Sequence, residues 1–324
     1  MSSIYSRISG TGRYLPERVL TNAELETMVD TTSEWILSRT GIERRHIAAD
    51  DQTTVDMAEG AAKQALEVAG VEPGEIDFLI VGTTTPDVVF PNVGCLLQER
   101  LGIRGCPAFS VEAACSGFIY ALSVADRFIA SGQAQRALVI GAETLSRITD
   151  WSDRATCVIF ADGGGAVVLE PSDQQGIISC HLGADGHYKD LLYYPYGVSK
   201  QQTEDDVERP YMQMKGNEVF KVAVKKLEEA VNEALQANDF GHDKVDWLIP
   251  HQANLRIIQA TAKRLDVSMD KVILTVQDHG NTSAASVPMA LDVAVRDGRI
   301  QRGDLLVLAA FGGGFTWGSA LIRY

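Results

Sequence analysis

The same order of predicted elements occurs twice along this chain. Each copy has an amphipathic helical pattern, a short turn and an apolar strand, and a second apolar strand follows about sixty residues later. In the first copy these elements are 57–69, 72–74, 76–81 and 137–140, and in the second they are 219–237, 240–242, 245–249 and 305–308. An internal repeat of this kind predicts two similar structural halves.

Helical patterns that alternate with continuously apolar strands predict parallel-type sheets with helices on both faces. Two such halves predict an α/β fold of five layers, a duplicated αβαβα sandwich. We expect the halves to span residues 1–171 and 172–324, because the apolar strand at 166–169 ends in polar turn residues. A chain of 324 residues is long enough for two such units.

Charge and cysteine content exclude several classes of function. The formal net charge of −14 argues against a general affinity for nucleic acid or anionic membranes. The five cysteines are odd in number and form no C-x-x-C pair, so we expect neither a disulfide framework nor a zinc site. No residue pattern suggests a metal or a bound redox cofactor. No apolar stretch is long enough to span a bilayer and the N-terminus has no apolar signal core, which indicates a cytoplasmic protein.

Cys115 lies where a strand-like segment runs through small residues into a helical pattern at 119–130. This order places the thiol at or just before the N-terminus of a helix, where the helix dipole and free N–H groups favour a thiolate. Its small neighbours leave room for a substrate. For this segment alone, a buried structural cysteine is the more frequent explanation.

Two further side chains could act on a substrate. His251 follows Pro250 at the end of the predicted strand 245–249, and ligands of α/β sheets collect at that edge. Its imidazole could donate a hydrogen bond to a developing oxyanion or enolate, serve as a base, or be structural. Asn281 lies in a glycine-containing turn before a helix, as a helix N-cap or as an active-site amide, and the cap is the more frequent case.

A run of three glycines at 312–314 follows the apolar strand 305–308. Such a run lets the backbone approach a ligand closely and direct an N–H at an oxyanion, although it is also typical of a tight turn between strands. The phosphate-binding patterns G-x-G-x-x-G and G-x-x-x-x-G-K-[ST] are absent from this segment.

Six motifs follow one another along nearly the whole chain. They are GTGRYLP (10–16), WILSRTGI (35–42), AACSGF (113–118), PHQAN (250–254), GNTSAAS (280–286) and FGGGFTWG (311–318). In this order and spacing they resemble the thiolase-like condensing enzymes and, more narrowly, the β-ketoacyl-acyl carrier protein synthase III family. Their coincidence outweighs the alternative explanation of each motif taken alone.

The resemblance implies a thiolase-like fold with a catalytic triad of Cys115, His251 and Asn281, and an oxyanion hole formed by the N–H groups of Cys115 and Gly313. It implies a decarboxylative Claisen condensation of an acyl-CoA primer, expected to be acetyl-CoA, with malonyl-acyl carrier protein. An asparagine in place of a second histidine points to the enzyme that initiates fatty-acid synthesis. The absence of a second cysteine at 311–318 disfavours thiolysis.

The same resemblance assigns contacts to coenzyme A. The adenine is expected between Trp35 and Arg154, the phosphates near Arg39, and the pantetheine arm along Gly216 and Asn254.

Two macromolecular partners are also implied. Phe90 would form an aromatic wall of the primer pocket across the interface of a homodimer. An acidic carrier protein would dock on a basic rim, by local charge complementarity, although these cations could also be an ordinary solvated helix face. The residues assigned to this rim are Lys221, Gln252, Ala253, Asn254, Leu255, Arg256, Lys263 and Arg264.

Two other functions remain open from the sequence. One is a Cys-His-Asn condensing enzyme of secondary metabolism, and the other is a catalytically silent module that binds acyl-CoA or carrier protein. Retention of all three triad residues disfavours the silent module, because binding alone needs no nucleophile. The length and branching of the primer depend on the depth of a pocket that the sequence does not reveal.

Overall fold

The computed structural model describes residues 5–199 and 211–324, which form two large sheets. The first sheet contains β1 (Tyr5–Tyr14), β4 (Phe78–Gly82), β5 (Ala108–Val111), β6 (Ala137–Thr144) and β7 (Asp162–Ser172). The second contains β8 (Ile177–Ala184), β11 (Trp247–Pro250), β12 (Leu305–Gly312) and β13 (Thr316–Arg323). The longer helices are α3 (Thr54–Ala69), α4 (Val93–Arg100), α5 (Gly117–Ala130), α6 (Gly216–Gln236), α7 (Leu255–Arg264) and α9 (Ser286–Arg296).

Smaller elements complete the described chain. They are the helices α1 (Asn22–Met28), α2 (Ser33–Thr40) and α8 (Val276–His279), and the strand pairs β2 (Arg18–Thr21) with β3 (Arg44–Ile47) and β9 (Leu192–Tyr193) with β10 (Gln213–Met214).

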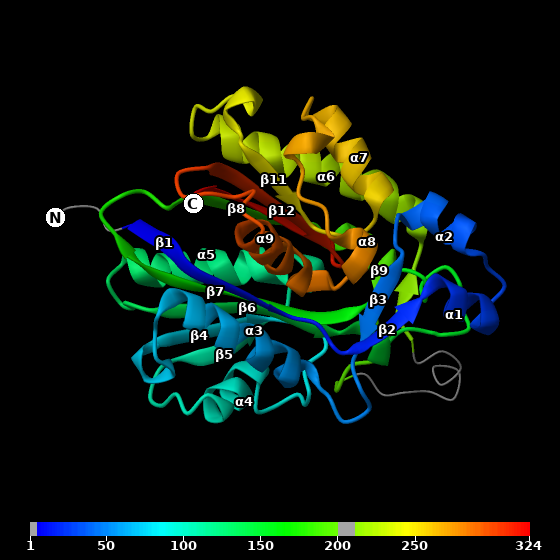
Figure 1. The fold of residues 1–324 in the computed structure, drawn as a ribbon, viewed down its shortest axis with the longest axis horizontal. Coiled ribbons are helices and arrows are strands. Elements are labelled where there is room, and N and C mark those ends of the chain that lie inside the picture. Colours follow the sequence, from blue (N-terminus) through cyan, green and yellow to red (C-terminus); the bar gives the residue numbers. More distant parts are fainter. Residues whose placement is uncertain (1–4, 200–210) are drawn as a thin grey trace.

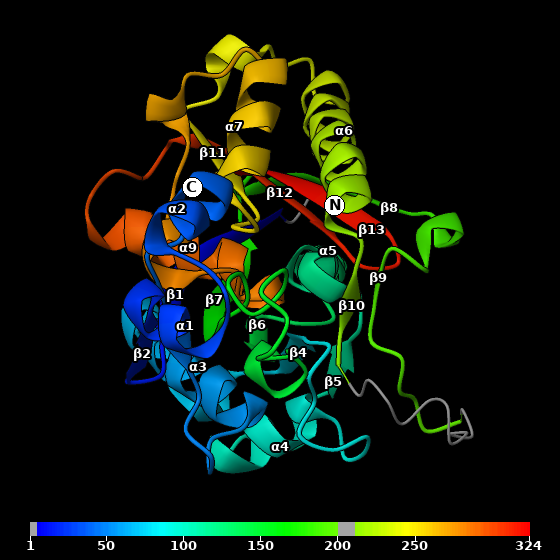
Figure 2. The ribbon, with the colours of Figure 1, turned by 90° about the vertical axis from the view of Figure 1, so that its right-hand side faces the viewer.

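The elements stack in five layers (Figures 1 and 2). Helices α5 and α9 lie between the two sheets, and one buried cluster joins Ile119 of α5 and Leu291 of α9 to Val139 of β6 and Leu308 of β12. Helices α3 and α4 cover the outer face of the first sheet, and α6 and α7 cover that of the second. The predicted αβαβα sandwich is therefore confirmed.

The two sheets repeat one topology. The order β1-β7-β6-β4 of the first sheet corresponds to β8-β13-β12-β11 of the second. In both, the first two pairings are antiparallel and the third is parallel. The first sheet has a fifth strand, β5, which pairs with β4. β11 of the second sheet corresponds to β4, and in place of a fifth strand it has an isolated bridge between Leu248 and Val272. We propose that residues 1–171 and 172–324 are the two halves of a tandem duplication.

The expectation of parallel-type sheets was wrong for four of the seven strand pairs within the two large sheets of the described chain, because these four pairs are antiparallel. Helices cover both faces of each sheet, so its strands are apolar on both faces whatever their direction. A continuously apolar run therefore indicates burial but not orientation.

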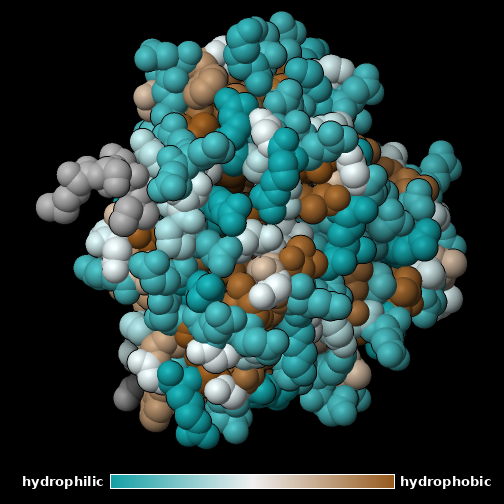
Figure 3. Space-filling model, turned by 60° about the vertical axis from the view of Figure 1, so that its left-hand side comes forward, coloured by the Kyte–Doolittle hydropathy of each residue, from teal (hydrophilic) through white to brown (hydrophobic). Residues whose placement is uncertain are grey.

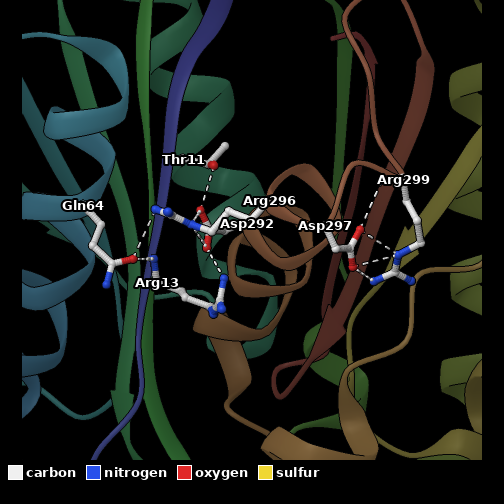
Figure 4. A network of polar contacts seen from close by, with 7 residues as sticks. All are labelled: Thr11, Arg13, Gln64, Asp292, Arg296, Asp297 and Arg299. Carbon is white, nitrogen blue, oxygen red and sulfur yellow. Dashed lines mark hydrogen bonds and ion pairs between the residues drawn. The ribbon is translucent and has the colours of Figure 1, made fainter.

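The two halves are tied together by a buried carboxylate (Figure 4). Asp292 of α9 is fully buried and accepts hydrogen bonds from Thr11 Oγ1 at 2.8 Å and Arg13 Nη1 at 2.5 Å, both on β1. Arg296 Nε, one helical turn along α9, lies 2.9 Å from both of its carboxylate oxygens. A charge buried in this way is stable only because these donors surround it.

Residues 5–199 and 211–324 contain no helix that is long and apolar enough to cross a membrane. They also contain no cluster of His, Cys, Asp and Glu side chains that could hold a metal ion. On the face shown in Figure 3, hydrophilic side chains predominate and apolar ones are scattered among them.

Candidate active site

One cavity of about 310 Å³ receives side chains from both halves of the chain. Its outer part is lined by α2, by the first turns of α6 and by the start of α7. Its buried end is lined by Cys115, His251 and Asn281, which are 8%, 3% and 5% exposed. The three residues expected to form the triad, which lie far apart in the sequence, therefore meet in one place.

Cys115 lies in a single 3₁₀ turn, Ala114–Ser116, directly before α5. This agrees with the position expected at or just before the N-terminus of a helix. The preceding Ala114 has a positive φ of 46°, which is costly for a residue with a side chain. The sharp turn presents the Cys115 thiol to the cavity instead of continuing the strand.

The glycine-rich segment of the second half holds this turn in place. A Cβ atom at Gly312 would lie 2.4 Å from the backbone nitrogen of Cys115, so only glycine fits there. Thr316 Oγ1 donates to Ala113 O at 2.7 Å, and Ser116 Oγ donates to Thr316 O at 3.0 Å. The segment is thus both a turn between β12 and β13 and a part of the site.

Burial raises the pKa of the Cys115 thiol to about 12. A hydrogen bond from the Ser283 hydroxyl opposes this shift, and the nearby Glu143 carboxyl group adds to it. Burial therefore opposes the thiolate that the helix terminus would favour. A helix terminus stabilises an anion by about 1–2 kcal/mol at most, which is less than the desolvation of a fully buried thiolate.

His251 continues the direction of β11, and its backbone N–H donates to Ala309 O at 2.7 Å. Its Nδ1 lies 2.6 Å from Ser286 Oγ, the first residue of α9, and this contact fixes the orientation of the ring. Burial lowers the pKa of His251 to about 3, so the imidazole is neutral across the physiological range. A neutral ring can still donate a hydrogen bond from its other nitrogen.

Asn281 is not the N-cap of a helix, because Thr282 holds that position before the 3₁₀ turn Ser283–Ala285. Its backbone pairs with the segment around Phe160, and its Oδ1 accepts a hydrogen bond from Ser283 N at 2.9 Å. This hydrogen bond fixes the amide. Its Nδ2 group has no protein acceptor in the described part of the chain and remains available to a substrate.

Trp35, Arg39 and Arg154 gather at the outer end of the site. The guanidinium carbon of Arg154 lies 4.9 Å from the centroid of the Trp35 ring, and that of Arg39 lies 6.0 Å from it. Because stacked planes are about 3.5 Å apart, an adenine between Trp35 and Arg154 would require roughly 7 Å, so Arg154 would have to move by about 2 Å.

Gly216 and Asn254 line the same cavity. A Cβ atom at Gly216 would meet only the end of Met214, at 3.8 Å, so the start of α6 leaves open space. Asn254 caps α7 by accepting from Arg256 N at 2.8 Å and donates from Nδ2 to Arg39 O at 3.1 Å. Its amide therefore joins α2 to α7, and both of its polar atoms already have partners.

The carrier-protein role expected for Gln252 was wrong. This side chain is 1% exposed, donates to Pro250 O at 2.7 Å, and accepts from Thr275 N at 2.8 Å. Its amide holds the loop after β11 against the segment before α8. An amide at this position satisfies buried backbone groups, which the sequence did not distinguish from a surface position.

The remaining rim residues lie on α7, on the loop before it, or on α6. Lys221, Arg256, Lys263 and Arg264 are exposed, whereas Ala253 and Leu255 are partly buried. Arg264 pairs with Glu228, and Arg256 lies 5.6 Å from the centroid of the Phe220 ring. The cations therefore gather on two neighbouring helices that also line the cavity.

Three residues expected in the triad, the oxyanion hole, the CoA site or the primer pocket do not line the cavity, namely Gly313, Phe90 and Arg154. Gly313 follows Gly312, whose Cα lies against the backbone of Cys115. Phe90 is 84% exposed in the loop before α4, beside the exposed Val88 and Val89.

Sequence reasoning missed much of the cavity wall. Val219, Ala223 and Leu227 of α6 line it at a spacing of four residues, and Leu192, Met214 and Phe220 lie beside them. The helical periodicity of α6 indicated a buried face, but a buried face packed on a sheet gives the same pattern.

The family model described as 3-Oxoacyl-[acyl-carrier-protein (ACP)] synthase III matches residues 109–186, and the model of its C-terminal part matches residues 235–324. The Beta-ketoacyl-[acyl-carrier-protein] synthase III of Thioalkalivibrio sulfidiphilus is 62% identical over 99% of both chains.

Two solved structures are also similar over nearly the whole chain. The 3-oxoacyl-[acyl-carrier-protein] synthase III of Aquifex aeolicus has a TM-score of 0.93 and 48% identity, covering 98% of this chain and 100% of its own. The priming beta-ketosynthase from the R1128 polyketide biosynthetic pathway has a TM-score of 0.94 and 38% identity, covering 99% and 97%.

A five-layered αβαβα fold with cysteine, histidine and asparagine at one cavity defines a condensing enzyme of the thiolase type. Such enzymes are acyltransferases. On the identity and coverage of its relatives, the chain belongs to the beta-ketoacyl-[acyl-carrier-protein] synthase III family.

Proposed function

We propose that this protein condenses an acyl-CoA primer with malonyl-acyl carrier protein to give a β-ketoacyl-acyl carrier protein, CoA and carbon dioxide, and so initiates fatty-acid synthesis. The observation that carries the proposal is the convergence of Cys115, His251 and Asn281 at the buried end of one cavity. The 62% identity to a named synthase III, against 38% to the polyketide priming enzyme, favours fatty-acid synthesis over secondary metabolism.

In the first half-reaction, the sulfur of Cys115 attacks the thioester carbonyl of the acyl-CoA, and the CoA thiolate leaves. The N–H groups of Cys115 and Gly313 stabilise the oxyanion that forms. The close approach of Gly312 to the Cys115 nitrogen supports this role, because it brings the following peptide group beside the nucleophile.

In the second half-reaction, malonyl-acyl carrier protein enters and loses carbon dioxide. His251 donates from Nε2 and Asn281 donates from Nδ2 to the thioester oxygen, which carries the enolate charge. The resulting carbanion attacks the acyl group on Cys115. Removal of one donor of this kind costs about 3–4 kcal/mol in other enzymes, a loss of roughly a hundred- to thousandfold in rate.

The outer part of the cavity binds CoA. Arg154 moves away from Trp35 to admit the adenine, Arg39 lies near the phosphates, and the pantetheine arm passes Gly216 and Asn254. The open space at Gly216 supports this path, because a side chain there would narrow the entrance.

The carrier protein docks on the exposed cations beside this entrance. These are Lys221, Arg256, Lys263 and Arg264, and the neighbouring Ala253, Asn254 and Leu255 contribute contact surface. A local basic surface lets a protein of net charge −14 bind an acidic partner, because the attraction acts over about one Debye length.

The proposal includes a homodimer, in which the exposed Phe90 reaches the primer pocket of the second copy. Its 84% exposure on the described chain supports this assignment. We further propose acetyl-CoA as the primer, a cytoplasmic location, and catalysis without a metal or organic cofactor, since the substrates and side chains account for every bond that changes.

Intact-protein mass spectrometry tests the proposal. The enzyme is incubated with acyl-CoAs of increasing chain length and then with malonyl-acyl carrier protein, and Cys115→Ser is treated in parallel. We expect one adduct on Cys115, its discharge as a β-ketoacyl product, and no adduct on the variant. If the wild-type enzyme forms no adduct, the protein binds its ligands without catalysing acyl transfer. An adduct on Cys115→Ser would refute the assignment of Cys115 as the nucleophile.

A further inference from the structure

Two backbone N–H groups beside the nucleophile have no oxygen acceptor in the described part of the chain. They belong to Cys115 and Gly313, and neither donates to a backbone or side-chain oxygen among residues 5–199 and 211–324. Because N–H groups away from solvent are nearly always paired, two neighbouring free donors are available to the oxygen of a ligand.

These two donors come from different halves of the chain. Cys115 lies in the 3₁₀ turn before α5, and Gly313 lies in the turn between β12 and β13. The two turns adjoin, since a Cβ atom at Gly313 would lie 3.7 Å from Ala114 Cβ. Both N–H groups can reach one oxygen atom only if the two turns keep a fixed spacing.

The hydroxyl group of Thr316, the first residue of β13, connects the two turns. Its Oγ1 lies 2.7 Å from Ala113 O and 3.2 Å from Gly313 O. A hydroxyl has one proton, so the bond to Ala113 O is the main one and Gly313 O shares the proton at longer range. Ala113 O also accepts from Ser116 N at 3.1 Å, which closes the turn around Cys115.

A second hydroxyl group makes the reciprocal contact. Ser116 is fully buried, and its Oγ donates to Thr316 O at 3.0 Å. The backbone of Thr316 pairs in register with Gly312 of β12 and Ala184 of β8, so it is anchored in the second sheet. We call the two hydrogen bonds from Thr316 Oγ1 to Ala113 O and from Ser116 Oγ to Thr316 O the Thr316 clamp.

The clamp lies outside the cavity that receives the substrates. Neither Thr316 nor Ser116 lines the cavity, and neither hydroxyl group has a hydrogen bond with His251 or Asn281. Any effect of Thr316 on the reaction must therefore pass through the backbone groups that its hydroxyl holds.

We propose that Thr316 is a positioning residue for the oxyanion hole, an inference that rests on the proposed function. Its hydroxyl fixes the spacing of the Cys115 and Gly313 N–H groups, so that both reach the oxygen of the tetrahedral intermediate. As Sγ bonds to the acyl carbon, the π electron pair of the carbonyl moves onto this oxygen. It returns when the bond to the CoA sulfur breaks, and the thiol proton of Cys115 ends on the CoA that leaves.

Alkylation of the same thiol separates this role from a general effect on Cys115. Iodoacetamide reacts with Sγ by direct displacement of iodide, so no oxyanion forms. Acetyl-CoA and p-nitrophenyl acetate both acylate Sγ through an oxyanion, and the ester does so without the CoA site. Loss of the clamp should therefore slow both acylations and leave alkylation unchanged.

The test compares Thr316→Val, which replaces the hydroxyl by a methyl group, with Thr316→Ser, which keeps it. The matched control is Thr149→Val, because Thr149 is 1% exposed and its Oγ1 donates to Leu145 O at 2.8 Å. Mass spectrometry of Cys115 follows the reactions with acetyl-CoA, p-nitrophenyl acetate and iodoacetamide.

Thr316→Val should be acylated about ten- to a hundredfold more slowly by both donors. Its KM for acetyl-CoA and its alkylation rate should stay within about twofold of the wild type. Thr316→Ser should recover acylation to within about threefold, and Thr149→Val should match the wild type in all three reactions.

Wild-type acylation rates in Thr316→Val would overturn the proposal, and so would an equal loss of alkylation, which would mean that the thiol itself had moved. If Thr316→Val does not fold, Ser116→Ala decides, because it removes the reciprocal bond. We expect at least a threefold loss of acylation with normal alkylation, and unchanged acylation would refute the clamp.

The two acyl donors distinguish this inference from the proposed function. If p-nitrophenyl acetate acylates wild-type Cys115 but no acyl-CoA does, the proposed function fails, and the rates with the ester still decide on Thr316. If neither donor acylates Cys115, both the function and the clamp are refuted. If both acylate it and only Thr316→Val is unaffected by its substitution, the clamp alone is wrong.

Discussion

His251 Nδ1 and Ser286 Oγ lie 2.6 Å apart at the buried end of the cavity. Ser286 Oγ also accepts from the backbone N–H of Gln252 at 3.2 Å, which leaves its own proton free to point at Nδ1. In that arrangement the ring proton is on Nε2, where it can be donated to the enolate oxygen. The first residue of α9 thus sets the tautomer of the histidine.

Ser286→Ala should therefore slow the condensation step. Loss of this hydrogen bond is worth about 1–2 kcal/mol, or roughly tenfold in the decarboxylation rate, whereas self-acylation by acyl-CoA should change less than about twofold. Release of carbon dioxide from malonyl-acyl carrier protein measures the first rate, and mass spectrometry measures the second. Ser319→Ala removes a buried serine that donates to Ala230 O at 2.7 Å and serves as the control. An equal loss in both half-reactions would contradict the assignment.

Arg154→Ala should raise the KM for acyl-CoA about tenfold, because one face of the adenine site would be lost. Arg147→Ala is the matched control. Arg147 and Arg154 each donate to a backbone carbonyl, and the guanidinium group of each lies 3.8 Å from the carboxylate of an exposed aspartate. Steady-state kinetics with varied acyl-CoA checks the effect, and the KM for malonyl-acyl carrier protein should stay constant. A similar rise for Arg147→Ala would mean that general charge, not stacking on Trp35, binds the nucleotide.

Arg256→Glu should raise the KM for malonyl-acyl carrier protein about tenfold while self-acylation stays intact. The effect should shrink as salt is added, because a rim charge acts through a screened long-range attraction. Lys63→Glu on α3, where the side chain is 64% exposed, is the control for the change in net charge. An effect on KM that does not depend on salt would argue against docking at this rim.

The repeat and the motifs predicted the layers and the position of the triad, because buried helices and strands leave strong periodic signals. Local sequence could not predict the protonation of Cys115, which depends on desolvation by groups from both halves. Gln252 was misassigned for a similar reason, since its polarity suggested the surface and only the fold shows that its amide is enclosed.

Asp292→Asn should lower the free energy of unfolding by about 2–4 kcal/mol. The variant keeps the shape of the side chain but leaves Arg13 and Arg296 without their anion, and the cost is moderated because both arginines still reach solvent. Asp297→Asn alters an exposed aspartate that pairs with Arg299 and should change stability by less than about 0.5 kcal/mol (Figure 4). Urea unfolding of both variants gives the comparison. Equal effects would show that the buried carboxylate does not hold β1 and α9 together.

His279 should make the protein less stable in mild acid. It ends α8, and its Nδ1 is buried without a hydrogen-bonding partner among residues 5–199 and 211–324. Burial lowers its pKa to about 4, with His46 and Arg13 adding to the shift. Between pH 6.5 and pH 4 the unfolded chain binds a proton at this position and the folded chain does not. The free energy of unfolding therefore rises with pH by about 1.4 kcal/mol per unit in this window from His279 alone, and by up to about 3 kcal/mol in total.

The variant His279→Gln removes this contribution, so its stability should depend less steeply on pH than that of the wild type between pH 4 and 6.5. His242→Gln, at an exposed histidine in the turn before β11, gives the matched control. Urea unfolding at half-unit intervals of pH yields the slopes, and only differences in slope matter, because each substitution also shifts stability by a constant amount. Parallel curves for the wild type and His279→Gln would mean that the imidazole is protonated in the folded protein as readily as in the unfolded chain.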